Sequence, residues 1–269
     1  MNKLKIDLGC GPCKKEGTIG IDVQEQPGVD CILDLQSEPL PFPDKSVEYV
    51  YSSHFLEHVE SAHYVAKIFA EISRVCVDGA ELEFWTPYTW SNSAFIFGHN
   101  LFFNEDHYLH PCVWHYDFWE KALKGRWLLK EITYIINPDV LVELYRNKIS
   151  IDFAQKYYKG IVREFGVFIE VRHEYKGENL QPKRTFAVDR SSKRYPVKSK
   201  SEVGWNPVEL ENAFEWFSSV ELERSQAQTE LEQFKDMVNV MQMSKFWKLR
   251  TAWFNFKKSI GLVTDTRSI

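Results

Sequence analysis

The sequence predicts an α/β protein built on an open, mostly parallel sheet. Short apolar segments with strand character recur from the N-terminus to about residue 173, separated by short connections. The first of them runs into a glycine turn, Gly9–Gly11, and the next two end on or beside an acid. One segment, 58–75, has the apolar spacing of an amphipathic helix. Strands that alternate with turns and a helix are typical of a parallel sheet.

Seven segments are predicted to be strands, of which the last is expected to be antiparallel. Prolines at positions 39, 41 and 43 remove backbone donors, so the stretch between the third and fourth strands is neither helix nor central strand. The predicted strands are 3–8, 18–23, 29–35, 47–53, 80–87, 127–135 and 166–173.

Helices are predicted at three places between or after these strands. The segments are 58–75, 114–123 and 138–165, with Pro138 suited to a first helical turn. Residues 14–17 are too few for a helix between the first two strands, because isolated short helices are marginal. We therefore expect the first connection to be reduced to a turn.

The chain is expected to divide into a main domain, 1–188, and a helical extension. Within the main domain, residues 88–125 interrupt the alternation and are rich in aromatic side chains and histidine. Residues 189–206 are polar and basic and contain Pro196 and Gly204, which suits a linker.

The extension begins with an acidic helix predicted over 207–243. Apolar residues alternate at spacings of three and four from Leu210 to Met241, which supports a coiled coil. Arg224 stands at one core position, so a single long helix packed on the main domain is an equal alternative. Residues 244–262 are predicted to form a basic, aromatic amphipathic helix, which suits either an anionic membrane surface or docking on protein.

Composition excludes several classes of protein. The 269 residues carry 33 Lys+Arg against 38 Asp+Glu, a net charge of −5 that argues against a nucleic-acid binder. An acid at position 7 argues against a secretory signal, and no apolar run is long enough for a transmembrane helix. Five cysteines, an odd number, suit reduced thiols in a cytoplasmic protein. The Cys10–Cys13 pair lacks a second ligand pair, so redox or zinc use is the minor alternative.

The glycine turn and the acids that follow it predict a ligand site. Glycine lets backbone approach a ligand closely, and the carboxyl ends of parallel strands share one edge of the sheet. Asp22 ends the second strand, where a carboxylate can accept both ribose hydroxyls, and Asp34 ends the third. Lys14 stands where a dinucleotide fingerprint needs glycine, and there is no phosphate-binding GxxxxGK[ST] loop. A nucleoside without phosphate fits this pattern.

Four segments in order resemble the motifs of class I S-adenosylmethionine-dependent methyltransferases. These are Ile6–Gly11 (IDLGCG), Pro39–Glu48 (PLPFPDKSVE), Ser53–Val59 (SHFLEHV) and Ile72–Ala80 (ISRVCVDGA). The resemblance implies a Rossmann-like, seven-stranded sheet with an antiparallel last strand. It also implies S-adenosylmethionine as the cofactor.

By that resemblance, the cofactor-binding residues come from the first four strand ends. Gly9, Cys10 and Gly11 would hold the methionine part, with Asp7 supporting the loop. Asp22 would bind the ribose, and Asp34 and Leu35 would flank the adenine. Ser53 and His54 would close the fourth strand end.

A general base for methyl transfer to oxygen is expected among the histidines. An imidazole near neutral pKa suits this task, and half of the eight histidines fall in 88–119. His107 is the first candidate, followed by His110 and His54; packing or hydrogen-bonding roles are the alternative for each. No metal site is expected; a set of His107, His110 and His115 with Asp106 is the minor alternative, because Pro111 disrupts the helical face.

The expected function is methyl transfer to a hydroxyl of a small-molecule or carbohydrate acceptor. The segment Ser244–Arg250 (SKFWKLR) is similar to tails of bacterial enzymes of surface-polysaccharide pathways, which points to a glycan acceptor. We expect a cytoplasmic protein, peripheral at the inner face of the membrane through 244–262, with self-association or a partner through 207–243. The alternatives are a non-catalytic adaptor of the same fold and a methyltransferase acting on protein or nucleic acid. The acidic main domain disfavours nucleic acid.

Overall fold

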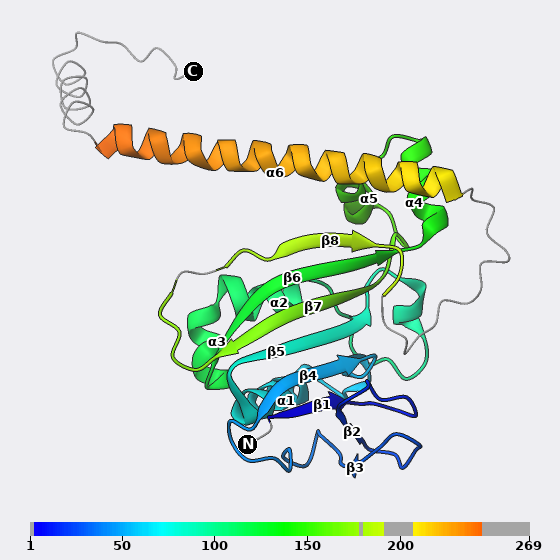
Figure 1. Ribbon diagram of the computed structural model, residues 1–269, viewed down its shortest axis with the longest axis vertical. Helices are drawn as coiled ribbons and strands as arrows, with labels where there is room; N and C mark the ends of the chain where they lie inside the picture. Colours follow the sequence, from blue (N-terminus) through cyan, green and yellow to red (C-terminus); the bar gives the residue numbers. More distant parts are fainter. Residues whose placement is uncertain (1–2, 178–179, 191–206, 244–269) are drawn as a thin grey trace, which may run out of the picture. The chain divides into compact units, whose positions relative to one another are not determined.

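The computed structural model describes residues 3–177, 180–190 and 207–243 of the chain. The chain divides into two compact units, Met1–Leu210 and Glu211–Ile269. The first unit holds a single eight-stranded sheet (Figure 1). None of the helices in the described ranges is long and apolar enough to cross a membrane.

The strands follow the order β3-β2-β1-β4-β5-β7-β6-β8 across the sheet. Their bounds are β1 Leu4–Leu8, β2 Ile19–Asp22, β3 Cys31–Ile32, β4 Val47–Ser53, β5 Cys76–Pro87, β6 Arg126–Ile136, β7 Val162–Arg172 and β8 Lys183–Ala187. All neighbours pair in parallel except β7, which lies antiparallel between β5 and β6. This is the Rossmann-like sheet with an antiparallel seventh strand that the sequence predicts, with β8 added in parallel beside β6.

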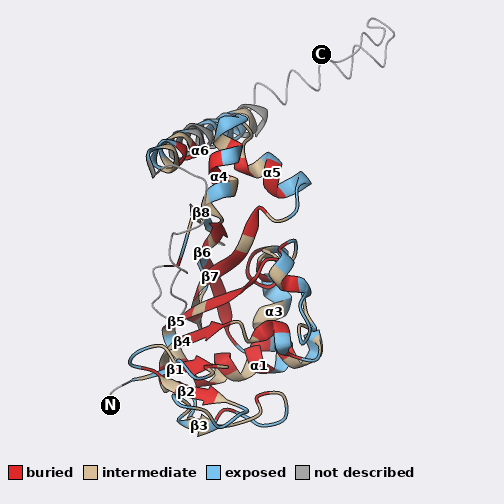
Figure 2. Cartoon of the chain, turned by 90° about the vertical axis from the view of Figure 1, so that its right-hand side faces the viewer, coloured by how far each residue is buried: buried red, intermediate tan, exposed pale blue. Residues whose placement is uncertain are grey.

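Helices pack on one face of this sheet. The helix α1, Ala62–Val75, and the helix α3, Tyr116–Leu123, lie together on that face (Figure 2). Phe69 of α1 stacks on Phe84 of β5 and packs against Trp127 of β6, which joins the helix to the sheet. The segment before α3 contains the short helix α2, Asp106–Leu109, and a π-helical turn, His110–Trp114.

The connection between β1 and β2 contains no helix, as the sequence predicts. Its backbone is held by Asp7, whose carboxylate accepts a hydrogen bond from Lys15 N at 2.8 Å. The Lys15 side chain extends over the face of the sheet opposite α1. Its ammonium group lies 2.6 Å from Glu83 and 4.1 Å from the centre of the Tyr51 ring. A lysine stem and aromatic rings thus cover a surface on which a crossover helix would otherwise pack.

The predicted helix over 138–165 is wrong in extent. It is two helices, α4 Pro138–Arg146 and α5 Ile151–Tyr157, and β7 begins at Val162. Lys148 between them has a φ of 54°, a left-handed conformation that a continuous helix cannot contain. Ser150 then caps α5, because its hydroxyl accepts a hydrogen bond from Phe153 N.

The predicted acidic helix is present as α6, Pro207–Met243. Arg146 and Glu209, both in the first unit, form an ion pair of 2.6 Å near its start. Within the second unit, Leu231 and Phe234 stand at predicted heptad positions and are exposed, as are their neighbours Met237 and Val240. The predicted linker lies outside the described residues except for its first two, Asp189 and Arg190. The predicted basic helix 244–262 lies entirely outside them.

Candidate active site

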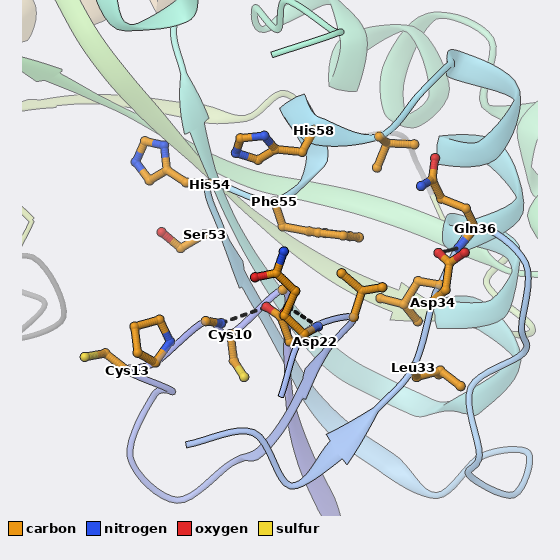
Figure 3. A pocket seen from close by; sticks show the side chains of 17 residues that line it. Cys10, Cys13, Asp22, Leu33, Asp34, Gln36, Ser53, His54, Phe55 and His58 are labelled. Carbon is orange, nitrogen blue, oxygen red and sulfur yellow. Dashed lines mark hydrogen bonds between the residues drawn. The ribbon is translucent and has the colours of Figure 1, made fainter. Parts of the chain in front are cut away.

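A cleft of about 610 Å³ opens at the carboxyl ends of β1, β2 and β4. In the sheet, β2 and β3 lie on one side of β1 and β4 lies on the other, so the strand order reverses at β1. The cleft lies at this point, where ligands bind in open α/β sheets. Its volume is within the range of ordinary small-molecule sites. Figure 3 shows the side chains that surround it, among them Asp22, Phe55, His54 and His58.

The glycine turn forms the floor of the cleft. Gly9 N and Cys10 N both donate to the carbonyl of Ile21, at 2.8 and 3.1 Å, which ties the turn to β2. Gly9 has a φ of 64°, and a Cβ there would lie only 2.4 Å from Cβ of Phe55. Glycine is therefore required for conformation and for space, and the Phe55 side chain lies directly over it.

Asp22 joins the glycine turn to the end of β2. Its Oδ2 accepts a hydrogen bond from Gly11 N at 2.9 Å, and its Oδ1 accepts one from Gln24 N at 3.0 Å. Each carboxylate oxygen keeps a further lone pair, so the group can still accept a ligand hydroxyl. The backbone contacts fix the direction of the carboxylate at the cleft wall.

Asp34 has a different role from Asp22. Its Oδ1 accepts from Gln36 N at 3.0 Å and its Oδ2 from the Ser37 hydroxyl at 2.8 Å, so it shapes its own turn. The turn places Leu35 on the wall of the cleft. Asp34 also lines the cleft, and like Asp22 it accepts one hydrogen bond at each oxygen, so a lone pair on each remains for a ligand.

The far wall holds a buried polar network that extends from β4 to β7. His54 lies between two carboxylates, with Nδ1 3.0 Å from Glu57 Oε1 and Nε2 2.9 Å from Glu164 Oε2. Arg190 reaches the same Glu164 oxygen at 2.9 Å and donates to the Ser53 hydroxyl at 2.8 Å. The network connects the ends of three strands through charged hydrogen bonds.

The charges of this network fix the protonation preferences of its members. Burial alone would lower the pKa of His54, but its hydrogen bonds to Glu164 and Glu57 outweigh burial and raise that pKa above its ordinary value. Burial alone would raise the pKa of Glu164, but the hydrogen bond from His54 and the charge of Arg190 hold it below its ordinary value. The imidazolium form of His54 is thus favoured beside the ionised form of Glu164.

The other two candidate histidines line a separate cavity. His107 and His110 border a space of about 430 Å³ formed by α1, the segment 101–111 and Trp119. His107 Nδ1 pairs with Asn104 Oδ1 at 2.7 Å, and desolvation lowers the pKa of His107. His110 Nδ1 accepts from the indole of Trp119 at 3.0 Å. Neither is among the residues that line the cleft of the glycine turn.

Sequence reasoning therefore finds the cleft but only part of its far wall. Gly9, Cys10, Gly11, Asp22, Asp34, Leu35 and Ser53 line the cleft, and Asp7 supports it from beneath. Phe55, Glu164 and Arg190 are not predicted, because they meet Gly9, His54 and Ser53 through contacts across 46 to 137 positions of chain. The only sequence feature that could have predicted Phe55 is its place in the SHFLEHV motif.

Comparisons with known proteins agree with a methyltransferase-type segment. Residues 20–84 match the family model described as "Methyltransferase domain", which covers β2 through most of β5. Among curated proteins, none matches the chain in sequence.

Several solved structures resemble the chain distantly. A SAM-dependent methyltransferase from Archaeoglobus fulgidus is 15% identical, with a TM-score of 0.44, over 62% of this chain and 86% of that chain. The YcgJ protein from Bacillus subtilis is 13% identical, with a TM-score of 0.40, over 65% and 93%. Geranyl diphosphate C-methyltransferase from Streptomyces coelicolor A3(2), in a complex with S-adenosyl-L-homocysteine, is 15% identical, with a TM-score of 0.39, over 63% and 72%.

Proposed function

We propose that the protein is an S-adenosylmethionine-dependent methyltransferase that methylates a hydroxyl group. The observation that carries this proposal is the cleft at the strand ends, where the Gly9–Gly11 turn is joined to Asp22. Within the described part of the chain, no lysine or arginine lines the cleft. An acidic cleft without a phosphate cradle fits a cationic nucleoside, and the family match over 20–84 is consistent with that ligand.

The chain's residues would divide the work between two walls. The glycine turn and Asp22 would bind the methionine and ribose parts, while Leu35 would pack against the adenine. The acceptor would approach from the His54 wall, where its oxygen lone pair attacks the methyl carbon as the C–S bond breaks. The bonding pair goes to sulfur, and the acceptor proton passes to the polar network or to water. We place His54 ahead of His107 and His110 beside the acceptor because it lines the cleft; as an imidazolium between Glu57 and Glu164 it would position the polar network rather than take the proton.

The acceptor class and the tail are part of the same proposal. The resemblance of 244–250 to tails of surface-polysaccharide enzymes supports a carbohydrate acceptor. The exposed apolar residues at Leu231 and Phe234 support association of the helix with a second copy or a partner. Sedimentation velocity of the full chain tests this, and a monomer at every concentration would argue against self-association.

Calorimetric titration with S-adenosylmethionine tests the cofactor assignment. We expect saturable binding to the wild type and a loss of about tenfold to a hundredfold in Asp22→Asn, because charge-assisted hydrogen bonds contribute about 1.5–3 kcal/mol. The matched control is Asp44→Asn, which removes the same charge from an exposed carboxylate paired with Arg74. Absence of binding to the wild type would reject the enzyme and leave the adaptor alternative.

A further inference from the structure

We propose that Glu57, His58 and His99 bind a divalent transition-metal ion at the rim of the cleft. One ligand atom from each of these side chains lies within 4.8 Å of the other two. Ligands bonded to a single ion at about 2.0–2.2 Å are at most about 4.4 Å apart, so small rotations bring the three into a common shell. Two imidazoles and one carboxylate suit Zn²⁺, Mn²⁺, Fe²⁺ or Co²⁺ better than Ca²⁺ or Mg²⁺.

The first independent observation is the state of the Glu57 carboxylate. Its side chain is 2% exposed, and its Oε1 is paired with His54. Among the described residues, no group donates a hydrogen bond to the buried Oε2. A buried carboxylate oxygen without a donor is costly, and coordination of a cation removes that cost.

The second observation is the state of the two imidazoles. Nδ1 of His58 lies 2.9 Å from the carbonyl of Gly98, and Nδ1 of His99 lies 3.3 Å from the carbonyl of Ala94. A carbonyl only accepts, so each Nδ1 carries the hydrogen. In the neutral ring, Nε2 is then left with a lone pair. This is the tautomer in which metal-binding histidines are held by their outer-shell partners.

The loop that carries His99 is fastened to the residues that it would join. Asn100 N and Leu101 N donate to the carbonyl of Glu57 at 2.7 and 3.1 Å, and the Asn100 side chain donates to the carbonyl of His58 at 3.0 Å. The imidazoles of His58 and His99 meet edge to face at 4.7 Å. Residues 41 positions apart are therefore brought together before any ion binds, which lowers the conformational cost of binding.

The proposed ion would act on the acceptor, and this step rests on the proposed function. His58 also lines the cleft, so open coordination positions would face the space in which the acceptor binds. Binding to the ion would lower the pKa of the acceptor hydroxyl, which would then release its proton to water before its oxygen attacks the methyl carbon. An acceptor with two neighbouring oxygen donors, such as a vicinal diol of a sugar, matches two open positions.

Metal binding is tested on the full chain independently of methyl transfer. The protein, stripped with chelator, is titrated with Zn²⁺, Mn²⁺ and Mg²⁺ by calorimetry, and Co²⁺ is added to record its visible absorption. We expect one equivalent of transition metal, weak or no Mg²⁺ binding, and a loss of at least about a hundredfold in His99→Ala. The control His63→Ala removes an exposed imidazole of α1 outside the set and should bind like the wild type.

Each outcome is decisive. Glu57→Gln should also abolish metal binding. Because Glu57 is buried, circular-dichroism melting is used to check that this variant folds. If it does not fold, the test rests on His99→Ala. Binding that persists in both variants, or no binding to the wild type, overturns the metal site. Titration with S-adenosylmethionine separates the proposals: cofactor binding without metal rejects this inference alone, and metal binding without cofactor rejects the proposed function alone.

Discussion

The cleft at the strand ends and the cavity around His107 and His110 are formed by different parts of the structure. Backbone turns shape the cleft: Gly9 and Gly11 adopt left-handed conformations, the Gly9 amide donates to the carbonyl of Ile21, and the Gly11 amide donates to Asp22. Side chains from α1, from the segment 101–111 and from Trp119 shape the cavity around His107 and His110. The three candidate histidines thus divide between the two places: His54 lines the cleft, and His107 and His110 line the cavity. The local backbone pattern therefore predicts which residues meet at one cleft, whereas the concentration of histidines does not.

The largest effect is expected at the turn itself. Gly9→Ala would combine left-handed strain of about 1–2 kcal/mol with an overlap with Phe55 of about 1–3 kcal/mol. Gly11→Ala meets no atom within 4 Å and would cost the strain alone. Urea unfolding should show the larger loss for Gly9→Ala; equal losses would mean that the approach of Phe55 does not constrain position 9.

The next largest effect compares a histidine of the cleft, His54, with a histidine of the cavity, His107. His54→Gln should lower the rate of methyl transfer by at least about tenfold, because it disrupts the network with Glu57 and Glu164 beside the cleft. His107→Gln should lower it less than about twofold. The measurement is kcat under saturating cofactor, with Asn104→Ala as a control that disturbs only the His107 pairing. A larger loss for His107→Gln would indicate that the acid–base step takes place in the cavity around His107 and His110.

These two comparisons show what the sequence could predict. The seven strands, the turn in place of a first crossover helix and the residues of the glycine floor follow from patterns within a few positions of one another. The break at Lys148 was missed because its left-handed conformation has no sequence signal comparable to glycine. Arg190 was read as part of a basic linker, and only tertiary structure shows its contacts with Ser53 and Glu164.

The smallest expected effect is chemical and involves no change of stability. Cys13 is exposed and lines the cleft, whereas Cys76 and Cys112 are buried and their pKa values are raised to about 12 by desolvation. Iodoacetamide at pH 8 should label Cys13 first and leave the other two unmodified in the native protein. Mass spectrometry measures the extent, and S-adenosylmethionine should slow labelling of Cys13. Labelling unaffected by saturating cofactor would place Cys13 away from the bound ligand.

The added strand β8 has a consequence for aggregation. An unpaired strand edge is a template for another chain, and β6 would be such an edge without its parallel partner. The new edge begins with two cations, Lys183 and Arg184, and the opposite edge strand, β3, is only two residues long. Charge at one border and brevity at the other make the sheet a poor template for intermolecular β-pairing.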